Sequence, residues 1–149
     1  MFTLVPVNFF DPATAREALG RVAALSADAS VSWRELPRYG AVLVYEGARE
    51  PIMLGLLQGL DQCPEYNKVL CSWRDGKLNI AVSQGRSLLL ANEYAAPDFV
   101  TAQYFIFLVL KSLQINPEVT SIRFMHPLDG EQEMALYRYF KAVDYLQAQ

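Results

Sequence analysis

Three β-type runs follow one another across residues 67–93 with almost no chain between them. They read KVLCSW, KLNIAVS and SLLLANEY, and RDGK at 74–77 and QGR at 84–86 connect them. Asp75-Gly76 between apolar or alternating runs predicts a hairpin, because a two-residue turn requires the positive φ that these residues tolerate. The sequence therefore predicts an antiparallel three-stranded meander, and this motif limits the folds open to the chain.

The most apolar stretch, DFVTAQYFIFLVLKSL at 98–113, follows the meander. The run from Phe99 to Leu110 is too short for a membrane-spanning helix, which needs about 20 apolar residues. Neither a membrane segment nor a signal peptide is expected. Because the stretch is apolar on nearly every side, we expect a helix that is covered on more than one face. Phe105 and Leu108 are expected to be buried in it.

The order of the remaining elements predicts the fold. After the apolar helix we expect a strand at 121–125, a helix around 130–141 and a last strand at 142–146. The later strands need crossover connections, which cover the sheet with helices. The prediction is an α/β fold, a ribonuclease H-like (actin-like ATPase) mixed sheet with helices on both faces. We assign residues 63–149 to this lobe.

Residues 1–62 are expected to form a partial N-terminal lobe, so that the first lobe is incomplete. Its predicted elements are a strand at 2–6, a helix at 11–25, strands at 31–36 and 41–46, and a helix at 51–60. Asp11 is suited to cap the first helix, and its apolar positions share one face: Ala15, Leu19, Val22 and Leu25. Gly55 and Gly59 are expected to let the last helix pack closely on one side.

Composition limits the classes of function. The chain has 149 residues, of which 52% are hydrophobic and 19% charged, with a net charge of −3. This is enough for one domain or two small lobes with a real core. The mild acidity makes nucleic acid an unexpected partner. Only Cys63 and Cys71 are present, which excludes a disulfide framework and favours a reducing cytoplasm.

Two long segments resemble an uncharacterised bacterial family of unknown function with an actin-like ATPase fold. They are FTLVPVNFFDPATAREAL and GRSLLLANEYAAPDFVTAQYFIFLVLKSLQINPE. The family is similar in its FTLVP strand, its apolar strand ending near Asn92, its Pro-Asp/Glu-Phe helix opening and its Asn-Pro-Glu helix exit. Its members have a further meander before FTLVP, so this chain is expected to be a fragment or a shortened member. These motifs are structural rather than catalytic.

The chain departs from the family pattern at both ends of the apolar helix. Ala96 stands where the family has a capping Thr, so Asp98 is expected to act at the helix start through the dipole alone. Gln114 stands where the family favours Gly, so a left-handed helix exit is not expected there.

The hairpin RDGK is the candidate for a nucleotide contact that an actin-like fold implies. Such folds place glycine-rich hairpins around phosphates, because backbone N–H groups must approach the phosphate oxygens closely. Arg74, Asp75, Gly76 and Lys77 are therefore weak cofactor-binding candidates. The turn lacks a second glycine and a following Ser or Thr, so an ordinary turn is favoured. The adenosine-side segment FMHPLDGE also has a lone glycine, Gly130, and neither ATP hydrolysis nor a cofactor is expected.

Other catalytic patterns are equally weak. Nucleases of this fold gather carboxylates around metal, but Glu93 and Asp144 are too few and are expected to be solvated at strand ends. His126 lacks a nucleophile partner and is expected to be a loop residue. Cys63 and Cys71 have no nearby His, so no metal site is expected. We assign no catalytic residue, and the chain is not expected to be an enzyme.

Four cations make the meander locally basic: Lys68, Arg74, Lys77 and Arg86. A polyanion surface is one interpretation, and protection of exposed strand edges is the favoured one.

Three function classes follow from these patterns. The first is a non-catalytic interaction or scaffold protein on a degenerate actin-like fold. The second is an ATP-binding actin-like protein whose pocket needs residues outside this chain, and the third is a nucleic-acid-associated protein. A protein partner or self-association is expected for the first class, with a homodimer formed through the first sixty or so residues if that lobe has an unprotected sheet edge.

Overall fold

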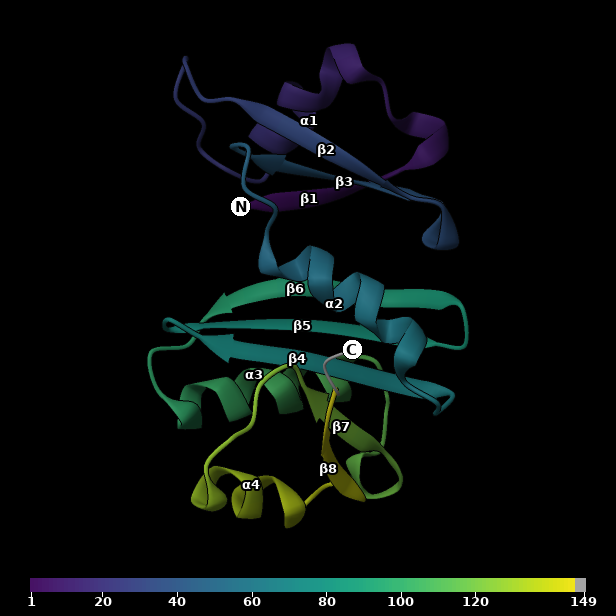
Figure 1. Cartoon of the computed structure of the whole chain (residues 1–149), viewed down its shortest axis with the longest axis vertical. Helices are drawn as coiled ribbons and strands as arrows, with labels where there is room; N and C mark the ends of the chain where they lie inside the picture. Colours follow the sequence, from purple (N-terminus) through teal and green to yellow (C-terminus); the bar gives the residue numbers. More distant parts are fainter. Residues whose placement is uncertain (147–149) are drawn as a thin grey trace. The chain divides into compact units, whose positions relative to one another are not determined.

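The chain divides by its internal contacts into two compact units, Met1–Leu54 and Gly55–Gln149. The computed structural model describes residues 1–146. The division falls inside helix α2 (Ile52–Gly59), whereas the sequence placed it after residue 62. Each unit is built around its own β-sheet (Figure 1).

The first unit contains a three-stranded antiparallel sheet in the order β1-β3-β2. Its strands are β1 (Phe2–Pro6), β2 (Val31–Leu36) and β3 (Ala41–Glu46), as the sequence predicted. On one face of β3, buried Val42 and Val44 pack with Ala15 and Leu19 of helix α1. Because β3 is central, β1 and β2 are the two edges of this sheet.

Helix α1 is shorter than the sequence predicted. It spans Ala15–Gly20, after a 3₁₀ turn whose start is capped by Asp11, which accepts a hydrogen bond from the Ala13 N–H at 2.9 Å. The predicted continuation to residue 25 is wrong, and the Val22 side chain is exposed. Gly20 is a poor helix former, and Arg16 donates hydrogen bonds to two carbonyl groups of the following loop, which holds that loop in place of a further turn.

The second unit contains a five-stranded mixed sheet in the order β6-β5-β4-β7-β8. Its strands are β4 (Asn67–Arg74), β5 (Lys77–Gln84), β6 (Ser87–Ala95), β7 (Ser121–Phe124) and β8 (Ala142–Tyr145). The first three form the predicted antiparallel meander. β7 then pairs parallel with β4, and β8 pairs parallel with β7. This is the mixed sheet that the order of elements predicted.

Helices α3 (Phe99–Ser112) and α4 (Gly130–Tyr137) lie on the same face of this sheet (Figure 1). The main core of the unit is between them and the strands, and it includes Ile80, Ile106, Phe124 and Leu136, all fully or almost fully buried. Burying one side chain of this size contributes about 1.5–3 kcal/mol. This core fixes the position of α3 on the meander, as the sequence predicted.

Helix α2 lies on the opposite face of the sheet (Figure 1). A Cβ atom at Gly59 would lie 2.8 Å from Leu146 Cδ2 and 3.1 Å from Leu70 Cδ2, so the glycine permits a close approach. The close packing predicted for this helix is confirmed, and helices cover both faces of the sheet. This face is also more polar, since Ser72 and Asn79 are buried on it opposite each other on β4 and β5.

Both ends of α3 differ from the sequence expectation. Asp98 is a true N-cap, because its carboxylate accepts a hydrogen bond from the Thr101 N–H at 2.8 Å. A side chain that reaches the N3 amide needs no Thr upstream. Gln114 has a φ of 57°, so the helix does leave through a left-handed residue although that residue is not glycine. The Ile115 N–H donates to the Leu110 carbonyl at 2.9 Å across this exit.

The expectation that α3 is covered on more than one face is wrong. Leu108, predicted to be buried, is 43% exposed, and Phe105 is only half-buried. The helix is apolar all round, but only the side toward the sheet is covered. Within residues 1–146, none of the helices combines the length and hydrophobicity that a bilayer-spanning segment requires.

Candidate functional site

The hairpin between β4 and β5 forms the tight turn that the sequence predicted. Asp75 has a φ of 53° and Gly76 a φ of 72°, the pair of positive values that a type I′ turn requires. The Gly76 carbonyl accepts a hydrogen bond from the Ala96 N–H at 2.8 Å, and Trp73 Nε1 donates to the Ala96 carbonyl at 2.9 Å. The hairpin is therefore held against the segment that leads into α3.

Two candidate residues that the sequence left apart meet beside this hairpin. Arg74 Nη1 lies 3.1 Å from Nε2 of His126, which follows β7. Arginine has only N–H donors, so a hydrogen bond in this contact would run from Arg74 to Nε2. His126 is the exposed loop residue that was predicted. The contact lies at the carboxyl ends of β4 and β7, the edge where α/β sheets bind ligands.

Acidic side chains lie near Lys77, the second cation of the hairpin, and near the start of α4. Lys77 Nζ lies 3.9 Å from Glu93 Oε1 on the neighbouring strand. At the start of α4, Asp129 accepts a hydrogen bond from the Gln132 N–H at 2.7 Å, and the Gln132 side chain accepts one from the Asp129 N–H at 3.1 Å. This capping box occupies amides at the helix start, and Glu131 adds negative charge there. An incoming phosphate would meet carboxylates at this end.

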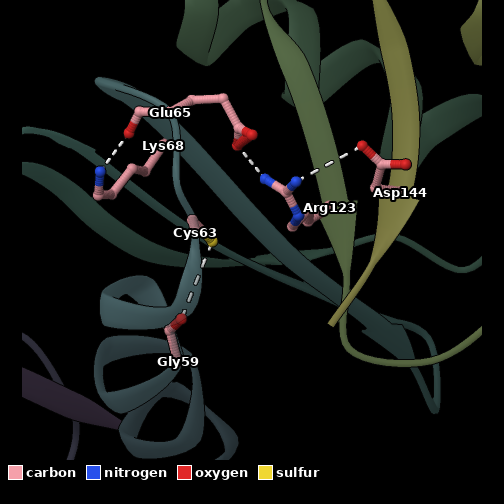
Figure 2. A network of polar contacts seen from close by, with 6 residues as sticks. All are labelled: Gly59, Cys63, Glu65, Lys68, Arg123 and Asp144. Carbon is pink, nitrogen blue, oxygen red and sulfur yellow. Dashed lines mark hydrogen bonds and ion pairs between the residues drawn. The ribbon is translucent and has the colours of Figure 1, made fainter. Parts of the chain in front are cut away.

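A polar network ties the chain after α2 to the last two strands (Figure 2). Arg123 on β7 forms an ion pair with Glu65, and its Nη2 lies 3.6 Å from Asp144 Oδ2 on β8. Lys68 donates a hydrogen bond to the Glu65 carbonyl. Partial burial alone would raise the pKa of Glu65, but the Arg123 hydrogen bond and charge outweigh it and hold that pKa below its usual range. Through Arg123, the network therefore links β7 to strand β8 and to the segment that contains Glu65.

The two cysteines are free and buried. Cys63 Sγ lies 3.8 Å from the Gly59 carbonyl beside the polar network (Figure 2). Burial raises the pKa of its thiol, although nearby Arg123 opposes the shift. Burial alone raises the pKa of the Cys71 thiol. Because the thiolate is the nucleophile, burial and the raised pKa both lower the reactivity of these two thiols.

The sequence predicted that Glu93 and Asp144 are solvated strand ends. Asp144 is next to the end of β8 and its side chain is 47% exposed, which agrees with the prediction, whereas Glu93 lies inside β6 and its side chain is only 29% exposed. They lie within β6 and β8, and each forms an ion pair with a cation on the adjacent strand. Strand pairing brings these charges together, which sequence spacing does not show. Among residues 1–146, no three His, Cys, Asp or Glu side chains gather in an arrangement that could hold a metal ion.

The cations of the meander do not share one surface. Lys68 begins β4 and Arg86 lies in the β5–β6 turn, whereas Arg74 and Lys77 flank the hairpin at the other end of β4 and β5. The interpretation that they protect strand edges is wrong for Lys68, Arg74 and Lys77, because β4 and β5 are interior strands. Two of the four cations lie at each end of these strands, so they do not form the concentrated positive surface that a polyanion site needs.

The feature that sequence reasoning missed is the outer face of α3. Val100, Tyr104 and Leu108 are exposed to 75%, 61% and 43%, and we call these three residues the α3 stripe. Their spacing of four residues was the available signal, because it places them on one side of a helix.

Aromatic rings flank the α3 stripe on both sides. Phe105 stacks on Tyr94 with ring centroids 4.4 Å apart, and Phe107 meets Tyr139 edge to face at 5.1 Å. Tyr139 is itself exposed. Stacked and edge-to-face rings hold one another in place. The stripe therefore belongs to a wider aromatic and apolar surface whose flanking rings pack against one another.

Two comparisons with known proteins gave a match, one with a protein family and one with a solved structure. A family model described as "Protein of unknown function (DUF3822)" matches residues 48–143. Among solved structures, the chain is similar to a Bacteroides thetaiotaomicron VPI-5482 protein "with actin-like ATPase fold and unknown function", determined at 1.85 Å. The TM-score is 0.80 and the identity 16%, over 97% of this chain and 64% of that one. No curated protein matches. The similarity that the sequence indicated is confirmed, and the fold is of the actin-like ATPase type.

Proposed function

The chain belongs to the DUF3822 family, and we propose that it acts as a non-catalytic interaction protein on a degenerate actin-like fold. The observation that carries the proposal is the α3 stripe with its aromatic flanks. Contiguous apolar surface of this kind marks interaction sites on soluble folds, and aromatic side chains dominate the energetics of protein interfaces.

The chemistry at the hairpin supports the same proposal. Gly76 and Lys77 are engaged within the fold, and the start of α4 is closed by its own capping box. A phosphate cradle needs backbone amides directed at the ligand in a positive field, whereas this edge of the sheet offers one arginine and several carboxylates. The hairpin therefore offers few of the groups that bind phosphate, whereas the outer face of α3 offers the exposed apolar surface that binds protein.

A photo-crosslinking amino acid placed at Tyr104 tests this proposal in the cells that make the protein. Met134 on α4 is the matched control position, because Tyr104 is 61% exposed and Met134 is 62% exposed. We expect a discrete covalent adduct with a protein from position 104 and none from position 134. Equal labelling at the two positions contradicts the proposal. So does ATP turnover by the purified chain that Asp75→Asn abolishes.

The second candidate function is an ATP-binding protein whose pocket needs residues outside this chain. The specific observation in its favour is the contact of Arg74 with His126 at the carboxyl ends of parallel strands. Calorimetric titration of MgATP into the full-length protein separates the two functions. Binding heat that disappears in both Arg74→Ala and His126→Ala supports nucleotide binding, and absence of heat from the full-length protein supports the interaction protein.

We further propose a cytoplasmic location. Cys63 and Cys71 are both free, and unpaired cysteines are typical of reducing compartments. Fractionation of cells with an antibody to the chain is the test. Recovery in an extracellular or periplasmic fraction contradicts this location.

A further inference from the structure

We draw no further inference here: the strongest candidate, the groove of about 360 Å³ between the edge strand β1 and helix α1 in the first unit, carries no proposal because a sheet edge accepts any extended segment and nothing among residues 1–146 shows which one covers it.

Discussion

Helices α3 and α4 pack into the same apolar cluster but show different outer faces. The outer face of α3 carries Val100, Tyr104 and Leu108 without a charge, whereas that of α4 mixes Met134 with Glu131 and Arg138. Single exposed apolar side chains among charges are ordinary. A continuous apolar line is less common, and it is the observation on which the proposed interaction function rests.

The inner faces differ in a second way. α3 contributes Ala102, Ile106, Val109 and Leu110 to the core, and α4 contributes one fully buried helical residue, Leu136. α3 is therefore held by packing, and α4 depends more on its capping box and on the strand that follows it. The variants described next compare the stability contributed by the inner and outer faces of α3. They also compare the packing of α3 with the capping of α4.

The largest effect is expected on the inner face of α3. Ile106→Ala removes a fully buried side chain and should lower the free energy of unfolding by about 2–5 kcal/mol. Leu108→Ala, two residues away and 43% exposed, should cost less than about 1 kcal/mol. Chemical denaturation followed by circular dichroism measures both values. Equal costs at the two positions would mean that the stripe is buried in the free chain.

The start of α4 should be the next most sensitive position. Asp129→Ala removes one half of the capping box and should cost about 1 kcal/mol. Asp129→Asn is the control, because an amide oxygen caps nearly as well. Urea unfolding of the two variants at neutral pH gives the comparison. If the two substitutions cost the same, the charge and not the cap supports this helix.

Acid should weaken the ion pair between Glu65 and Arg123, which lies beside the strand that follows α4. The folded-state pKa of Glu65 is lowered, so its contribution is present above the ordinary value of 4.5 and is lost as the pH falls through the lower folded value. Between about pH 6 and about pH 3, the melting temperature of the natural chain should therefore fall more than that of Glu65→Gln. Parallel curves for the two proteins would show that the Arg123 pair contributes no stability.

The smallest effect is expected at the exit of α3, and it is a gain. Gln114 holds a left-handed conformation with a φ of 57°. Gln114→Gly should raise the free energy of unfolding by about 0.5–1 kcal/mol, because glycine adopts this conformation without a steric penalty. Gln114→Ala should give no gain, and thermal melting distinguishes the two. A loss of stability in the glycine variant would indicate that the Gln114 side chain makes a stabilising contact.

Local chemistry explains what the sequence predicted well. Asp75-Gly76 has one preferred turn, and the apolar runs around it have the spacing of strands, so the meander and the order of the later elements followed from short-range patterns. The same holds for Gly59, where two glycines on one side of a helix indicated close packing. The predicted continuation of α1 failed because the pattern of apolar residues outlasted the helix, which ends at Gly20.

The candidate site was less predictable, because its contacts are non-local. Arg74 meets His126 only since β4 pairs with β7, and Arg123 meets Asp144 only through the pairing of β7 with β8. The exposed side of α3 was missed for a different reason. An apolar sequence indicates that a surface is covered, but it does not indicate whether the cover is part of the same chain.

A photo-crosslinking amino acid at Val100, carried in cells by the natural chain and by two lysine variants, tests most directly whether the outer face of α3 binds protein. Tyr104→Lys places a charge in the centre of the α3 stripe, and Met134→Lys places one at an equally exposed position on α4. The account predicts a discrete protein adduct for the natural chain and for Met134→Lys, and loss of that adduct for Tyr104→Lys with an unchanged melting temperature. A Tyr104→Lys variant that forms the adduct as strongly as the natural chain would contradict it.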